Sequence, residues 1–450
     1  MTFSRRELIT RGVAGAMVAL APAGTAVAES ASQDTAGSSQ NAKTKPLQML
    51  ANPLPGSPVI GFDGYDMRDS LRPQRLTLAM WEEAYVMRHM PGGSFADYDR
   101  VLDETVERGY NTLRIDPLPQ YVDLSKPDRI LSWGSPHQPF MPWGRNTAVK
   151  GPIGRWIIDF IEKLHKRPSL HYTLSAWWGM PGGSSASAAP TPLRRPKNML
   201  EGAEMWATQL TDWKKRFGFD RLIYVDIANE TPYFFPDLME RFQKVTGASW
   251  GESHVLSPAQ ISFMSEEVNK PLALLRREFP ELRFTISIHD DLRWLHMPLE
   301  LDCLDVHFYA DSDPRWTKRT RFDEFIAQGV FKNDSWFAEF SERATKTAAS
   351  MAPMLHAHQR FKMGEFATWA AQLGSPLTTS EAWSSWYYID SPNLDWSWLL
   401  DWSAWTVEDA IACQFWGWTP FNYAQPQFAI WKDVPWQRAL NERFLQSSGR

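Results

Sequence analysis

The chain has 450 residues, of which 43% are apolar and 22% are charged, as in ordinary globular proteins. Its 52 acidic and 47 basic side chains leave a formal net charge of −5, which argues against a nucleic-acid binder that depends on a basic surplus. Two cysteines are too few for a disulfide scaffold, and past the N-terminus no stretch approaches the roughly 20 apolar residues of a membrane span.

Residues 1–28 predict an export signal. A twin-arginine pattern surrounds Arg5 and Arg6, a weakly apolar run follows, and a small-x-small cleavage site ends at Ala28. We therefore expect export by the twin-arginine route to the periplasm or the cell exterior. An amphipathic helix of the mature protein is the alternative interpretation. Residues 29–46 are mainly small or polar and predict a flexible tether.

Residues 47–450 are expected to form a single domain, in which β-rich segments alternate with amphipathic helical segments from about residue 76. The predicted strands are Leu76–Tyr85, Thr112–Pro117, Leu170–Trp177, Arg221–Ala228, Arg283–His289, Cys303–Phe308, Leu377–Ala382 and Ala412–Trp418. The predicted helices are Phe95–Arg108, Pro152–Lys166, Asn198–Phe217, Pro258–Phe279, a short Leu292–Leu299, Ser341–Ala371 and Trp396–Ala410. This order predicts an α/β fold, a (β/α)₈ TIM barrel with long loops at its C-terminal face.

The connections point to the same architecture, because those from helix to strand are short and those from strand to helix are long. The chain also holds 23 Trp, 25 Phe and 12 Tyr residues, and four of the tryptophans fall on long loops: Trp133, Trp143, Trp250 and Trp316. Aromatic side chains fill cores, but flat rings on loops can also line a groove for sugars. Their position on the loops favours a carbohydrate groove.

Two carboxylates follow strands on opposite sides of the predicted barrel mouth. Glu230 ends the fourth strand, after Asn229, and Glu381 ends the seventh. Hydrolysis of a glycosidic bond needs one protonated carboxyl group to release the leaving oxygen and one ionised carboxylate to attack or to activate water. Their environments must hold the two pKa values apart.

With these residues in view, the chain resembles glycoside hydrolase clan A, and within it the cellulase-like enzymes of the family 5 type. The resemblance implies that Glu230 is the general acid/base and Glu381 the nucleophile of a retaining mechanism, with a raised pKa for Glu230. It also implies roles for residues that orient the nucleophile or hold the sugar: Arg114, Asn229, His307, Tyr309, and Trp416 or Trp418 as the sugar platform. No cofactor and no metal are implied.

Several assignments have structural alternatives. Glu230 could cap the following helix, Arg114 could pair with Asp116, and His307 could be an ordinary buried histidine. Glu365, in Gly364-Glu365-Phe366, is the alternative nucleophile, but it falls within a predicted helix.

Three other features of the sequence are less specific. Where the family often has a His-Asn pair after the third strand, this chain has Ser175–Trp178, so part of the sugar contacts should differ. His289–Asp291 could touch substrate or simply begin a loop. His356 and His358 are two residues apart on a predicted helix and cannot chelate one metal together.

The sequence therefore predicts an exported retaining glycoside hydrolase that cleaves a β-glycosidic bond of an oligosaccharide, polysaccharide or glycoconjugate by double displacement. A carbohydrate is the expected partner, with no nucleic acid and no membrane after signal removal. A non-catalytic carbohydrate-binding barrel and a transglycosylase of the same fold are the alternatives.

Overall fold

The computed structural model describes residues 71–133, 149–179, 194–235, 237–251, 255–295, 297–330, 334–383 and 385–447. The predicted export signal, the predicted tether and Trp143 lie outside these residues, so the predictions made for them stay predictions.

Ten parallel strands of the described residues form one sheet that closes on itself. They are β1 (Leu76–Glu82), β2 (Thr112–Ile115), β5 (His171–Ser175), β6 (Leu222–Asp226), β7 (Phe284–Thr285), β8 (Ser287–His289), β9 (Leu304–Tyr309), β10 (Leu377–Thr378), β11 (Ala382–Trp383) and β12 (Gly417–Trp418). β7 and β8 are two halves of one crossing of the wall, since β7 pairs with β6 and β8 pairs with β9. β10 and β11 likewise share one crossing beside β9, so ten strands make eight crossings. Pairing of β12 with β1 closes the barrel, which confirms the predicted (β/α)₈ fold.

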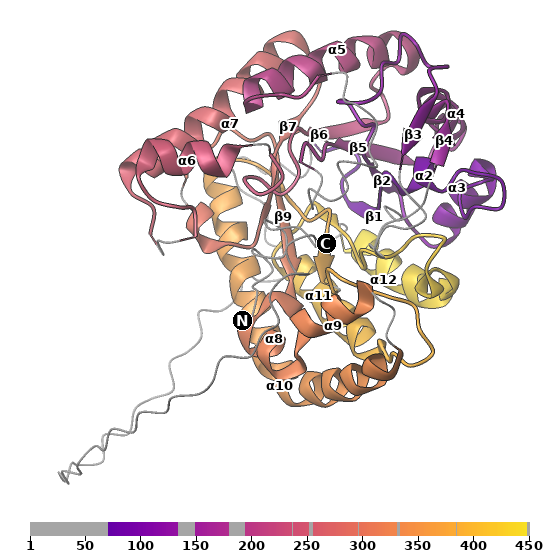
Figure 1. Ribbon diagram of the computed structural model, residues 1–450, viewed down its shortest axis with the longest axis vertical. Coiled ribbons are helices and arrows are strands. Elements are labelled where there is room, and N and C mark those ends of the chain that lie inside the picture. Colours follow the sequence, from indigo (N-terminus) through magenta and orange to yellow (C-terminus); the bar gives the residue numbers. More distant parts are fainter. Residues whose placement is uncertain are drawn as a thin grey trace, which may run out of the picture.

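The helices surround this sheet (Figure 1). They are α2 (Ala84–Met87), α3 (Tyr98–Glu107), α4 (Ile153–His165), α5 (Met199–Phe217), α6 (Leu238–Thr246), α7 (Pro258–Glu278), α8 (Pro314–Thr320), α9 (Phe322–Val330), α10 (Asp334–Leu373), α11 (Ser397–Ala412) and α12 (Val434–Gln446). A small antiparallel pair, β3 (Leu131–Trp133) and β4 (Val149–Gly151), lies in the connection after β2. The short fifth helix of the prediction is a single 3₁₀ turn, Leu292–Trp294.

Local sequence signals explain where the main helices begin and end. The side chain of Asn198 accepts a hydrogen bond from the backbone N–H of Glu201 and so starts α5, which ends at Gly218 with φ +68°. At α7, Ser257 and Gln260 form a capping box around Pro258, which needs no helical N–H partner at this position. Predicted and observed helices therefore agree closely at these ends.

The apolar interior is divided into a main layer between strands and helices and a second aromatic cluster. The second cluster is built largely from α8, α9, α10, α11 and the loops beside them. It contains Trp316, whose ring centroid lies 4.7 Å from that of Trp398. Trp250 is 1% exposed and packs on Trp294 in the main layer. Both tryptophans fill cores, so the expectation that they line a sugar groove is wrong.

None of the helices in the described part of the chain has both the length and the apolar character needed to cross a membrane.

Candidate active site

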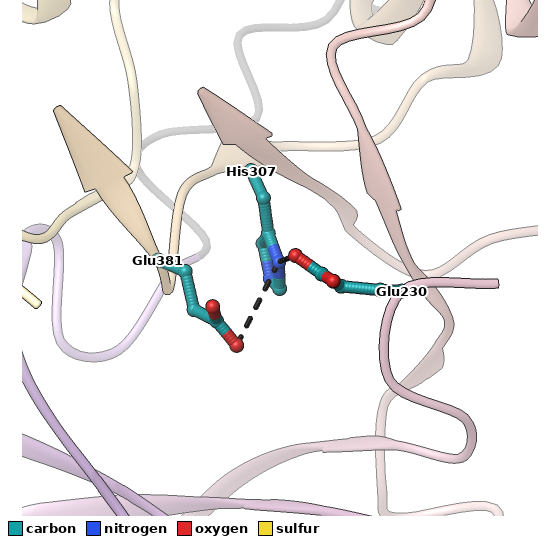
Figure 2. A group of neighbouring side chains, drawn as sticks. All are labelled: Glu230, His307 and Glu381. Atoms are coloured by element: carbon teal, nitrogen blue, oxygen red, sulfur yellow. Dashed lines mark hydrogen bonds and ion pairs between the residues drawn. The ribbon is translucent and has the colours of Figure 1, made fainter. Parts of the chain in front are cut away.

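Glu230 and Glu381 meet at the carboxyl-end mouth of the barrel. Glu230 follows β6 and Glu381 immediately precedes β11, and both side chains are buried, with 2% and 0% of their surface exposed. A carboxylate oxygen of one lies within 4.8 Å of a carboxylate oxygen of the other. The imidazole of His307 stands between them and faces both carboxylates (Figure 2).

Both oxygens of Glu381 are held by hydrogen-bond donors. Arg114, on β2, donates to Oε1 at 2.5 Å, and the hydroxyl of Tyr309, at the end of β9, donates to Oε2 at 2.5 Å. The side-chain amide of Asn422 donates to the Tyr309 oxygen at 2.8 Å, and Asn422 Oδ1 accepts the backbone N–H of Ala382 at 2.7 Å. This chain of donors fixes the direction in which the Glu381 carboxylate points.

Arg114 is the centre of the charge network in the mouth. Besides Glu381, its guanidinium contacts Glu82, Asp226 at 3.3 Å and the side-chain oxygen of Asn229. Burial alone would lower the pKa of Arg114, but the surrounding carboxylates outweigh burial and raise that pKa well above its usual range. The alternative pairing of Arg114 with Asp116 is not what the structure contains, because Asp116 accepts the backbone N–H groups of Leu118 and Trp177 instead.

Glu230 has a different environment, made by two histidines rather than by an arginine. His289 Nε2 lies 2.8 Å from Oε2, and His307 Nδ1 lies 3.1 Å from Oε1. His307 Nε2 lies 3.2 Å from the hydroxyl of Ser380, which donates to Asp305 at 2.7 Å. Burial opposes the charged form of His307, yet Glu381 and the hydrogen bond with Glu230 outweigh it and raise its pKa above the ordinary value. Glu230 is buried here, so the alternative role as a surface helix cap is excluded.

Asn229 leaves one polar group unused inside the protein. Its side-chain oxygen accepts from Arg114 and from the hydroxyl of Ser287 at 3.1 Å, which orients the amide. Its Nδ2 is buried and has no hydrogen-bond partner among the described residues. A buried amide N–H₂ without a partner is costly, and it is available to a ligand oxygen that enters the mouth.

A family model described as sugar-binding cellulase-like matches residues 78–445. The chain belongs to this cellulase-like family. The match spans the whole barrel and confirms the resemblance predicted from the strand ends. No curated protein matches the sequence at a significant level.

Three solved structures are similar to this cellulase-like protein, and the first of them shares its fold. A candidate glycoside hydrolase from Parabacteroides distasonis is 22% identical, with a TM-score of 0.66, over 82% of this chain and 93% of its own. The cellulose synthase subunit Z of Clostridioides difficile is 10% identical, with a TM-score of 0.44, over 82% and 99%. An endocellulase of Pyrococcus horikoshii, solved with cellotetraose, is 12% identical, with a TM-score of 0.44, over 82% and 92%. At 22% identity, the similarity to the Parabacteroides distasonis structure shows a shared fold and nothing about activity.

Trp416 and Trp418 do not lie where a sugar platform is needed. Trp416 precedes β12 and belongs to a cluster at the floor of the barrel, where it packs near Tyr224 and donates to the carbonyl of Pro73. Trp418 packs between the sheet and α12, with its ring 5.6 Å from that of Phe444. The prediction that one of them faces the reacting sugar is wrong, because Trp416 precedes the strand and Trp418 packs against α12.

The two candidate nucleophiles lie in different parts of the structure. Glu365 lies in the middle of α10, whereas Glu381 stands in the mouth beside Arg114 and Tyr309. His356 and His358 point to different carboxylates, those of Asp409 and Asp313.

Of three further residues at the site, the sequence offered His289 only as one that could touch substrate, and it singled out neither Glu82 nor Asn422. Glu82 ends β1 and contacts Arg114, Asn422 supports Tyr309, and His289 touches Glu230. For His289, the position at the end of the fifth strand was the available signal. Glu82 and Asn422 carried no signal, because Glu82 stands beside Glu83 in the sequence and Asn422 lies beyond the last strand.

One group of side chains among the described residues could hold a metal ion: Glu230, His307 and Glu381. Their ligand atoms are close because His307 already makes a hydrogen bond with Glu230 and lies 3.7 Å from Glu381. Hydrogen bonding therefore accounts for the cluster without an ion.

Proposed function

We propose that this cellulase-like protein is a retaining β-glycosidase. The observation that carries the proposal is the approach of Glu230 and Glu381 within 4.8 Å, oxygen to oxygen. Retaining enzymes place their two carboxyl groups about 5–5.5 Å apart, whereas inverting enzymes leave about 6.5–9.5 Å for a water molecule. The spacing favours double displacement over direct attack by water.

The surroundings of the two carboxylates support different roles for them. Glu381, aimed by Arg114 and Tyr309, attacks the anomeric carbon and forms a glycosyl-enzyme. Glu230, which lies between His289 and His307, donates a proton to the departing oxygen. In the second half Glu230 takes a proton from water, whose oxygen attacks the anomeric carbon and releases Glu381.

Asn229 fits the position of a sugar contact. Its partnerless Nδ2 would donate to a sugar hydroxyl beside the cleaved bond, because Arg114 and Ser287 already hold its oxygen. A hydrogen bond to the sugar 2-hydroxyl strengthens as the transition state develops.

The test is turnover of a panel of aryl β-glycosides by the wild type and by the variants Glu230→Ala and Glu381→Ala, with Glu365→Gln as the matched control. We expect both alanine variants to lose at least about a thousandfold in kcat/KM, in line with the loss of a covalent or proton-transfer group. The control should keep the wild-type rate. Binding of polysaccharide without product from any panel member would favour the non-catalytic alternative, and sugar transfer to added alcohols in place of water would favour the transglycosylase.

We also propose that the protein leaves the cytoplasm by the twin-arginine route. The support is the pattern around Arg5 and Arg6 and the cleavage site ending at Ala28. Changing both arginines to lysine should leave the precursor in the cytoplasm, and unchanged export of this variant would contradict the proposal.

A further inference from the structure

Glu82 is a third carboxylate in the mouth, brought there by an irregular strand end. It is the last residue of β1 and is fully buried. The pairing of β1 with β2 shifts register between Met80 and Glu82, and Glu82 has φ +46°. A left-handed backbone costs energy for a residue with a side chain, and such residues concentrate at functional sites. Glu230 has the same φ value.

Glu82 and Glu381 share one nitrogen of Arg114. Nη1 of Arg114 contacts Glu82 Oε1 and donates to Glu381 Oε1 at 2.5 Å. The other oxygen of Glu82 accepts from the hydroxyl of Ser175 at 3.0 Å and from the indole N–H of Trp177 at 2.9 Å. Glu82 is thus fixed at both oxygens, and its protonation state acts directly on Arg114, the group that orients Glu381.

The charges facing Glu82 make a second negative charge at this point unfavourable. Burial is the largest influence on the pKa of Glu82 and raises it. Arg114 lowers this pKa. The neighbouring acidic groups raise it further, to about 8: Glu381, Asp116 and Glu83. Together these influences favour the protonated form of Glu82, which shares one guanidinium with Glu381.

We propose that Glu82 is a positioning residue that acts on the nucleophile through Arg114. As a neutral acid it leaves Arg114 to orient Glu381, and as a carboxylate it competes with Glu381 for Nη1 and repels it. The switch breaks only the carboxyl O–H bond of Glu82, whose electron pair stays on the carboxylate while the proton passes to solvent. This inference rests on the proposed glycosidase function.

The experiment compares the wild type with Glu82→Gln and Glu82→Ala on a dinitrophenyl β-glycoside. This leaving group departs without a proton, so the ionisation of Glu230 does not limit kcat/KM at high pH. Glutamine keeps the shape of the protonated acid and cannot ionise, whereas alanine removes one of the four partners of Arg114. Glu365→Gln serves as the control, and the melting temperature of each variant reports folding.

We expect the wild-type kcat/KM to fall at least threefold between about pH 7 and pH 9, around the pKa of Glu82. Glu82→Gln should stay within about threefold of the wild type at pH 6 and lose this fall at higher pH. Glu82→Ala should be at least about tenfold slower at every pH, because Arg114 loses one of the partners that fix its position.

Two results would overturn the inference: the same fall above pH 7 in Glu82→Gln as in the wild type, or a hundredfold loss in Glu82→Gln at pH 6. The second would mean that the ionised carboxylate is the working form. If Glu82→Ala does not fold, the glutamine comparison still decides.

A second readout separates this inference from the proposed function. Infrared difference spectra should show a protonated carboxyl band that disappears as pH rises past 8 in the wild type and is absent in Glu82→Gln. If the wild type cleaves no glycoside but this band is found, the glycosidase proposal fails while the proton on Glu82 stands. If the band does not depend on Glu82, the inference fails whatever the activity.

Discussion

Tyr309 donates its hydroxyl proton to Glu381 at 2.5 Å, and that same hydroxyl oxygen accepts from Asn422 at 2.8 Å. Because the amide of Asn422 occupies the acceptor side, the hydroxyl proton of Tyr309 has to point at Glu381. The Glu381 carboxylate, the proposed nucleophile, is thus aimed by a tyrosine from β9 that is itself held by the segment after β12.

Removing this donor should slow the reaction without unfolding the protein. A hydrogen bond to a charged group contributes about 1.5–3 kcal/mol, so Tyr309→Phe should lower kcat/KM for an aryl β-glycoside by roughly 10–150-fold. The melting temperature should change little, because the ring stays in place. Wild-type kinetics in Tyr309→Phe would contradict the assignment of Tyr309 to the nucleophile.

The pH dependence of stability should reveal His307. Its pKa is raised in the folded protein, so its contribution is fully present below the unfolded value of about 6.5 and is lost as pH rises through the folded pKa. Urea denaturation of the wild type and of His307→Gln should therefore differ more in unfolding free energy at pH 5.5 than at pH 9. Equal differences at both pH values would show that the carboxylates do not favour the charged imidazole.

Trp418 should stabilise the folded protein and should not contact the sugar. It is buried against Phe444 of α12, and truncating a buried tryptophan typically costs about 3–5 kcal/mol. We expect Trp418→Ala to lower the melting temperature while KM stays within about twofold. A raised KM at an unchanged melting temperature would restore the sugar-platform interpretation.

Removal of metal ions should have no effect on activity. Glu230, His307 and Glu381 could hold an ion, but both nitrogens of His307 already interact, with Glu230 and with Ser380. Turnover should be the same after dialysis against EDTA as before. Activity lost to EDTA and regained with a divalent cation would show that the cluster is a metal site.

The sequence predicted the parts of the site that lie at regular strand ends. The residues concerned lie in the carboxyl half of a strand or follow it, and parallel strands bring these ends to one face: Arg114, Asn229, Glu230, His307 and Tyr309. The barrel and its helices could be predicted for the same reason, because periodicity and caps are local properties of the sequence.

What could not be predicted depends on contacts between distant segments. Glu82 enters the mouth through a register shift between β1 and β2, which no local pattern distinguishes from the neighbouring Glu83. The placement of Trp416 at the barrel floor follows from the start of β12 at Gly417, and that start depends on how far α11 extends. Asn422 reaches Tyr309 from beyond the last strand.

The claim that Glu381 attacks the sugar is tested most directly by trapping the glycosyl-enzyme. With a 2-deoxy-2-fluoro β-glycoside that carries a dinitrophenyl leaving group, hydrolysis of the glycosyl-enzyme is slowed more than its formation, so the glycosyl-enzyme accumulates. Mass spectrometry of a protein digest then locates the label. The account predicts one fluorosugar on the peptide that contains Glu381 and none in Glu381→Ala. A label on another side chain, or none on a protein that still cleaves the unfluorinated substrate, would contradict it.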